Sequence, residues 1–237
     1  MIDHIVSSQV INDPWPHSII NQVMDEELWQ CVEEATIALA PHILHGADSI
    51  DVRCSYEQGV LPSTINKIVD FADTLIDRHV EILSKFQHVK LSKYGYMMDL
   101  RWGFLKNQTD PFFDIHTDTY NPSKKMTFIV YTSPLKDCGT LTFSDMTTFD
   151  SEVPWEINSG LMFCPSETSW HSYKNYHAET PRITLNFYFH EIDSWFDKQY
   201  REKTIERLGE ARVEWFLSYF KQGKLIRTDY DFLGLFK

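Results

Sequence analysis

The chain has 237 residues and a formal net charge of −12, and 43% of its residues are hydrophobic. This length suits one large domain, and the apolar content supports a sizeable core rather than a disordered chain. The negative charge argues against a broad nucleic-acid footprint and against an anionic membrane partner. We therefore expect a single domain over residues 1–237, with nucleic acid disfavoured as a partner.

The sequence shows no sign of membrane insertion or secretion. No apolar stretch approaches the roughly 18 residues that a spanning helix needs. The first residues do not form a charged-then-apolar leader. The four cysteines are widely separated and form no Cys-x-x-Cys pair: Cys31, Cys54, Cys138 and Cys164. We expect a cytoplasmic protein with reduced thiols, and the sequence carries no signal for its oligomeric state.

The N-terminal part, about residues 1–88, is expected to be helical. Asp25 is placed to cap a helix that runs to about Ala40, where Pro41 ends it. Apolar residues then recur at spacings of three and four over residues 63–86, which predicts a second helix. His79 lies on that apolar stripe, and we interpret it as a core or boundary histidine.

The sequence of the middle of the chain predicts β-strands, and a charged amphipathic helix is expected to follow at about residues 193–222. The expected strands lie near residues 89–105, 112–118, 126–133, 140–144, 155–163, 169–174 and 182–190. Helices followed by a run of strands indicate an α+β, mainly β domain. We expect a double-stranded β-helix, or jelly-roll, over about residues 89–190. The N-terminal helices would pack on one sheet, and the C-terminal helix would close the domain.

A candidate metal site comes from two histidines and one aspartate. His116 and Asp118 stand two residues apart, so on a strand both side chains would face the same way and reach one ion. His171 would add a third ligand from a distant strand. Two histidines and one carboxylate that leave the other positions open are typical of non-haem Fe(II) oxygenases. His177 is the rival third ligand, but the sequence around His171 favours that residue.

Arg182 is a candidate anion-binding residue beside this site. It lies 182 − 171 = 11 residues after His171 and opens a strand with alternating apolar residues. A guanidinium there can hold a carboxylate through two parallel hydrogen bonds. Lys124 and Lys125, just before another predicted strand, are the alternative cations.

Residues 89–190 resemble the Fe(II)- and 2-oxoglutarate-dependent dioxygenase superfamily, most closely its prolyl 4-hydroxylase-like branch. The resemblance rests on the residues above and on segments at 126–133, 138–143 and 160–164. The second of these reads Cys-Gly-Thr-Leu-Thr-Phe, with Cys138 where the family has a glycine. Arg182 stands where collagen-type prolyl hydroxylases have lysine. The compact layout is similar to small microbial and phage members.

This resemblance implies Fe(II) as the metal, 2-oxoglutarate as co-substrate, O2 as oxidant and ascorbate as a supporting reductant. It implies that Arg182, Tyr131 and Thr184 bind the far carboxylate of 2-oxoglutarate. The reaction would hydroxylate an unactivated C–H bond of a peptidyl proline, an amino acid or another small metabolite, with release of succinate and CO2. The candidate substrate-pocket residues are Arg101, Trp102, Asn107, Tyr120, Trp170, Asn186 and Tyr188.

Two alternatives stay open. The first is a catalytically inactive metal-binding jelly-roll module, against which the intact set of His116, Asp118, His171 and Arg182 counts. The second is a nucleobase-demethylating enzyme of the same fold. The acidic composition and the lack of basic–aromatic clusters count against this second alternative.

Overall fold

The computed structural model describes residues 2–43, 46–92, 96–106, 113–177 and 179–191, together with residues 202, 205 and 206. The helix expected at about residues 193–222 lies outside this description apart from those last three positions, and Asn107 also lies outside it. Within the described residues, no helix has the length and apolar character needed to cross a membrane.

The elements in chain order are α1 (Asp3–Val6), β1 (His17–Ile20), α2 (Glu26–Leu39), η1 (Ala40–His42), β2 (Gly46–Asp51), η2 (Val52–Gln58), α3 (Pro62–Asp77), α4 (His79–Leu83), β3 (Tyr96–Lys106), β4 (Lys124–Tyr131), β5 (Thr140–Phe143), β6 (Phe149–Glu152), β7 (Gly160–Phe163), β8 (His171–Tyr173) and β9 (Arg182–Glu191).

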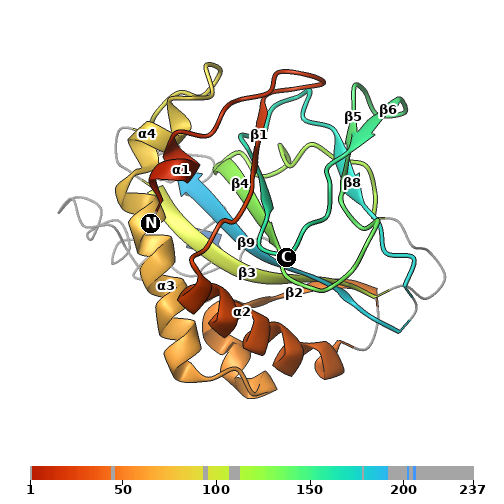
Figure 1. Cartoon of the computed structure of the whole chain (residues 1–237). Coiled ribbons are helices and arrows are strands. Elements are labelled where there is room, and N and C mark those ends of the chain that lie inside the picture. Colours follow the sequence, from red (N-terminus) through yellow and green to blue (C-terminus); the bar gives the residue numbers. More distant parts are fainter. Residues whose placement is uncertain are drawn as a thin grey trace.

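Two antiparallel sheets form the centre of the molecule. The larger sheet has six strands in the order β1-β7-β4-β9-β3-β2, and the smaller has three in the order β6-β5-β8. Figure 1 shows α2 and α3 on one side of the large sheet, with β5, β6 and β8 away from them. The result is a mixed fold with a β-rich core, consistent with the jelly-roll expected from the sequence.

Alternation along β9 separates the two faces of the large sheet. Ile183, Leu185, Phe187 and Phe189 are buried in the main hydrophobic core together with residues of α2 and α3. Residues two apart on a strand share a face, so Arg182, Thr184, Asn186 and Tyr188 lie on the other one. The sheet therefore has an apolar face against the helices and a polar face toward the smaller sheet.

The expected N-terminal helices form, with one break. The Asp25 carboxylate accepts a hydrogen bond from the Leu28 backbone N–H at 3.0 Å, which caps α2 as predicted. The helix expected at residues 63–86 is instead divided into α3 and α4 at Arg78. The apolar periodicity continues across this break, since Ile82 and Leu83 are also buried, and so the sequence pattern did not reveal it.

The strand expected at residues 112–118 is wrong for the described residues 113–118. Only an isolated bridge pairs His116 with His171 there, and Asp118 adopts a left-handed backbone with φ 66°. Aspartate tolerates this conformation better than most residues, and the Asn121 N–H closes a turn on the Asp118 carbonyl at 3.4 Å. Hence the left-handed turn, and not alternation along a strand, points the Asp118 side chain toward His116.

The other strand predictions differ mainly at their ends. β4, β5, β8 and β9 match the expected strands closely, whereas β3 begins at Tyr96 and β7 begins at Gly160. β1, β2 and β6 were not expected from the sequence. Among the described residues all three are the outermost strands of their sheets, where a continuous apolar pattern is not required.

Candidate metal centre and anion pocket

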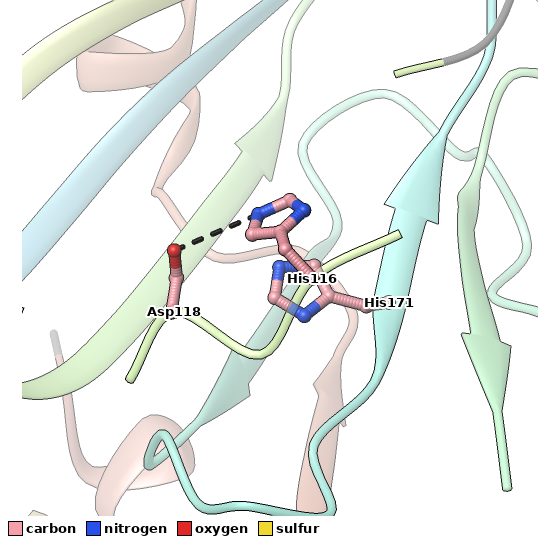
Figure 2. A group of neighbouring side chains, drawn as sticks. All are labelled: His116, Asp118 and His171. Carbon is pink, nitrogen blue, oxygen red and sulfur yellow. Dashed lines mark ion pairs between the residues drawn. The ribbon is translucent and has the colours of Figure 1, made fainter. Parts of the chain in front are cut away.

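His116, Asp118 and His171 meet at one point (Figure 2). Each offers a ligand atom, and these atoms lie within 4.8 Å of one another. The His116 and His171 backbones exchange two hydrogen bonds, of 3.0 and 2.9 Å, which hold the segment before Asp118 against the start of β8. The His116 Nε2 atom lies 3.6 Å from the Asp118 Oδ1 atom. The structure therefore brings together the three residues that the sequence singled out.

Both imidazoles are oriented by carbonyl groups on their far side. The His116 Nδ1 lies 2.7 Å from the Asp114 carbonyl oxygen, and the His171 Nδ1 lies 2.8 Å from that of Ser169. A carbonyl oxygen can only accept, so each Nδ1 carries a proton and Nε2 is the nitrogen that faces the cluster. This tautomer suits metal binding through Nε2, and the hydrogen bond at Nδ1 fixes each ring in place.

The carboxylate of Asp118 is buried and ionised. Burial by itself would raise its pKa, but Lys124, His171 and His116 and a hydrogen bond from Thr127 together hold the pKa below its usual value. The Thr127 hydroxyl donates to Oδ2 at 2.9 Å, and the Lys124 ammonium lies 3.1 Å from Oδ1. Burial, followed by the neighbouring His116, lowers the pKa of His171 to about 4. At neutral pH the group thus holds an anionic carboxylate and a neutral His171.

A cavity of about 470 Å³ opens onto these residues. This volume falls within the range of small-molecule binding sites. The cavity is lined by Asp48, Ser49, Gly103, Phe104, Phe113, His116, Asp118, Tyr120, Lys124, Thr127, Ile129, His171, Tyr173, Arg182, Thr184, Asn186 and Tyr188.

Arg182 supplies a buried cation to the same cavity. Its side chain is held by a hydrogen bond from Nε to the Cys138 carbonyl at 2.9 Å. The guanidinium carbon lies 4.7 Å from the ring centre of Tyr173, 5.0 Å from that of Trp155 and 5.8 Å from that of Tyr131. The Nη2 atom is buried and has no hydrogen-bond partner among the described residues. A buried donor without an acceptor is unfavourable, so this end of the cavity is suited to an anion.

The two tyrosines beside Arg182 are placed differently. The Tyr131 hydroxyl donates to Thr140 Oγ1 at 2.9 Å, and its ring stacks on Trp155 outside the set of cavity-lining residues. Tyr173 does line the cavity, and burial raises the pKa of its hydroxyl, which therefore keeps its proton. Sequence reasoning overlooked Tyr173, although it stands two residues after His171 and so shares the face of that residue on β8.

Three of the expected pocket residues line the cavity and three do not. Asn186, Tyr188 and Tyr120 are among the lining residues, as is Thr184 at the anion end. Trp102 is fully buried on the opposite face of β3, in the core against the helices.

The remaining expected residues serve other contacts. Arg101 forms an ion pair with Asp99 at 2.9 Å, and the Trp170 carbonyl accepts a hydrogen bond from the Trp15 indole. The rival ligand His177 is exposed, with its Nε2 atom 3.1 Å from the Lys136 carbonyl oxygen. His177 is not part of the metal-ligating cluster.

No protein-family model and no curated protein matches the sequence. Solved structures with a similar fold do exist. One is a prolyl hydroxylase of Trichoplax adhaerens in complex with a peptide fragment of the hypoxia-inducible-factor oxygen degradation domain. It aligns with a TM-score of 0.54 and 14% identity, over 75% of this chain and 84% of its own.

Two further structures extend the comparison. A prolyl-4-hydroxylase of Pseudomonas putida has a TM-score of 0.50 and 12% identity, over 80% of this chain and 96% of its own. The non-haem α-ketoglutarate-dependent epimerase SnoN of nogalamycin biosynthesis has a TM-score of 0.50 and 11% identity, over 74% of this chain and 77% of its own. The chain therefore has the fold of these prolyl hydroxylases and of the α-ketoglutarate-dependent epimerase.

Proposed function

We propose that this chain is an Fe(II)- and 2-oxoglutarate-dependent oxygenase that hydroxylates an unactivated C–H bond. The observation that carries the proposal is the presence in one cavity of a two-histidine, one-carboxylate cluster and a buried arginine with an unpaired N–H. The first group suits Fe(II) and leaves coordination positions open, and the second suits the far carboxylate of 2-oxoglutarate. A peptidyl proline, an amino acid or another small metabolite is the substrate class.

The residues would divide the work as follows. His116 and His171 would hold the metal through Nε2, and Asp118 through its carboxylate, while Thr127 keeps that carboxylate turned toward the histidines. Arg182 would bind the far carboxylate of 2-oxoglutarate, with Thr184 on the same strand face. Because the Tyr131 hydroxyl is engaged by Thr140, we assign the accompanying phenol hydrogen bond to Tyr173 and a supporting position to Tyr131.

When bound, the metal and the co-substrate supply the oxidising chemistry: 2-oxoglutarate and O2 are converted to succinate and CO2, and one oxygen atom enters the substrate C–H bond. The protein contributes the arrangement of ligands. It also contributes the buried Arg182 guanidinium, which is already positioned for the far carboxylate of the co-substrate. Ascorbate would keep the metal reduced between turnovers.

Addition of Fe(II) and then 2-oxoglutarate without oxygen tests this function. The charge-transfer absorbance of the chelate should appear only when both are present, and slow succinate formation should follow admission of oxygen. His171→Ala should abolish the absorbance and His177→Ala should retain it. Metal binding without either co-substrate binding or succinate would instead support an inactive metal-binding module.

A further inference from the structure

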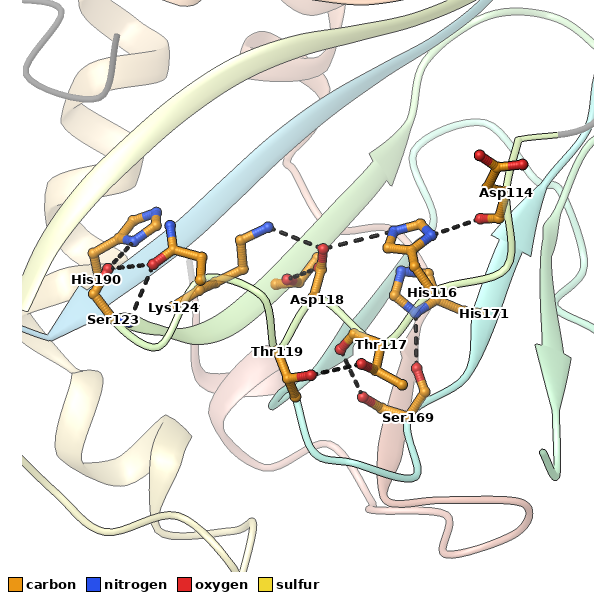
Figure 3. A network of polar contacts seen from close by, with 12 residues as sticks. Asp114, His116, Thr117, Asp118, Thr119, Ser123, Lys124, Ser169, His171 and His190 are labelled. Atoms are coloured by element: carbon orange, nitrogen blue, oxygen red, sulfur yellow. Dashed lines mark hydrogen bonds and ion pairs between the residues drawn. The ribbon is translucent and has the colours of Figure 1, made fainter. Parts of the chain in front are cut away.

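Lys124 is a second cation in the cavity, on the other side of the Asp118 carboxylate from His116 (Figure 3). Its ammonium lies 3.1 Å from Asp118 Oδ1 and 4.3 Å from the ring centre of Tyr188. The side chain is only 9% exposed. Water therefore solvates this charge poorly, and the surrounding protein groups must stabilise the ammonium instead.

A β-bulge turns Lys124 toward the cavity. In the pairing of β4 with β9, Lys124 lies opposite His190 and Met126 lies opposite Phe189, so Lys125 is an extra residue. Without the bulge, strict alternation would place Lys125 on the cavity face with Thr127. Instead Lys125 pairs with Glu191 at 3.1 Å and does not line the cavity. Bulges that re-aim a side chain are common beside binding sites.

The partner of Lys124 is also a candidate metal ligand. Among the described residues, Asp118 is the one carboxylate in contact with the Lys124 ammonium. A metal on the cluster would draw on the same carboxylate and place a second positive charge nearby. The neighbouring Asp99 is already paired with Arg101. A buried charge that loses its partner is unfavourable, so metal binding would favour a new anion beside Lys124.

This anion site is separate from the one at Arg182. The two cations share none of their contact residues. Arg182 contacts Cys138, Tyr131, Trp155 and Tyr173. Lys124 contacts Asp118, Tyr188 and Tyr120. Arg182 and Tyr188 are six residues apart on β9, or about 20 Å along an extended strand. A carboxylate bound at Arg182 would therefore not contact Lys124, whose partner in the structure is Asp118.

Asn186 provides a second polar group between these two ends. It is 7% exposed, lines the cavity, and its Oδ1 atom has no hydrogen-bond partner among the described residues. Its amide folds over Gly103 on the neighbouring strand, where an added Cβ would lie 2.5 Å from Asn186 Nδ2. Glycine at this position thus makes room for the side-chain amide of Asn186.

We propose that Lys124 binds a carboxylate of the substrate, so the substrate is a carboxylate-bearing molecule. This inference rests on the proposed function and adds the substrate class to it. Asn186 Oδ1 would accept a hydrogen bond from an N–H or O–H of the same molecule. Since the co-substrate takes part of the 470 Å³ cavity, the space left suits a small acid, an amino acid or one acidic side chain.

The test uses protein loaded with Mn2+ and 2-oxoglutarate, with acetate as the probe and acetamide as its neutral counterpart. Paramagnetic relaxation of the methyl protons reports how close each probe comes to the metal. Acetate should show saturable relaxation, and acetamide should bind at least about tenfold more weakly because it lacks the charge. Lys124→Met and Lys124→Gln should reduce the acetate effect by a similar factor, and Lys125→Met should leave it unchanged.

Several results would overturn the proposal. Equal relaxation of acetate and acetamide would do so, as would an acetate effect that survives in both Lys124 variants. If those variants lose 2-oxoglutarate rather than acetate, Lys124 belongs to the co-substrate site. The relaxation of the 2-oxoglutarate protons, read in the same samples, tests the proposed function separately: the co-substrate can bind normally while acetate does not. Unfolding midpoints of both variants exclude loss of fold as the cause.

A last arm identifies the source of the carboxylate. Acetyl-aspartyl methylamide presents the same carboxylate on a peptide backbone. Tighter binding than acetate, still dependent on Lys124, supports a peptide-borne acid. Binding of acetate alone supports a free acid.

Discussion

The two cations in the cavity are held in different ways. Arg182 is fixed by the Cys138 carbonyl and by three aromatic rings, none of which belongs to the metal-ligating cluster. Lys124 is held by Asp118, which does belong to it. Binding of a metal would therefore leave the surroundings of Arg182 unchanged and alter those of Lys124.

This difference indicates an order of events at the site. The Arg182 end is ready for a carboxylate whether or not metal is present, because its geometry is set by the surrounding protein. The Lys124 end becomes available for an anion only when a metal engages Asp118. A preorganised end beside a conditional one would favour binding of the metal before the substrate.

The largest expected effect is a loss of metal affinity at the cluster of His116, Asp118 and His171, without a change at the Arg182 end of the cavity. His171→Ala should weaken metal binding by at least about a hundredfold, because changes in outer-shell partners alone cost about 10–100-fold. Calorimetric titration with Mn2+ measures this. The Arg182 end should keep its structure, so near-ultraviolet circular dichroism should change little.

His177→Ala is the matched control for this substitution. It removes an imidazole that lies outside the cluster, so metal affinity should equal that of the unaltered protein. A variant pair with the reverse behaviour would show that the cluster assembles differently in solution.

Arg182→Lys tests whether the preorganised Arg182 end of the cavity binds the co-substrate carboxylate. The variant keeps a positive charge but loses the two-pronged geometry, and 2-oxoglutarate affinity should fall by about ten- to a hundredfold, the equivalent of 1.5–3 kcal/mol for a charge-assisted hydrogen bond. Metal affinity should stay within twofold or so of the original value, since Arg182 contacts no cluster residue. Normal 2-oxoglutarate binding by this variant would transfer the anchor role to Lys124, which also lines the cavity.

Thr127→Val tests how Asp118 is positioned. The valine has nearly the same shape but cannot donate the 2.9 Å hydrogen bond to Asp118 Oδ2. Metal affinity should fall by about tenfold, at the low end of the effects of outer-shell partners. Affinity of the metal-free protein for anions at Arg182 should not change. An unaltered metal affinity would mean that Lys124 alone is enough to orient the carboxylate.

Tyr173→Phe should have the smallest effect and distinguishes the two tyrosines near Arg182. Loss of one phenol hydrogen bond is expected to weaken 2-oxoglutarate binding by about fivefold, or about 1 kcal/mol. Tyr131→Phe should instead lower the unfolding midpoint through loss of the Thr140 contact and leave 2-oxoglutarate affinity unchanged. The opposite pattern would restore Tyr131 as the residue that contacts the co-substrate.

A substantial part of the site could be predicted from the sequence because the relevant signals are local. The alternation of polar and apolar residues on β9 follows from the two-residue period of a strand, and it correctly separates Arg182, Thr184, Asn186 and Tyr188 from the core. The same period, applied to His116 and Asp118, named residues that do converge. However, they converge through a turn with a left-handed Asp118 rather than along a strand.

Other features were decided by contacts between distant segments. Strict alternation along β4 would place Lys125 on the cavity face, and the bulge in the pairing of β4 with β9 replaces it with Lys124. Likewise, the pairing of β5 with β8 and the contact of Tyr131 with Thr140 determine which tyrosine reaches the cavity. The residue types at the site and their order along the strands are thus determined by the sequence itself. Which side chains enter the cavity is decided by tertiary structure, because a shift of one residue in strand register reverses every side chain that follows it.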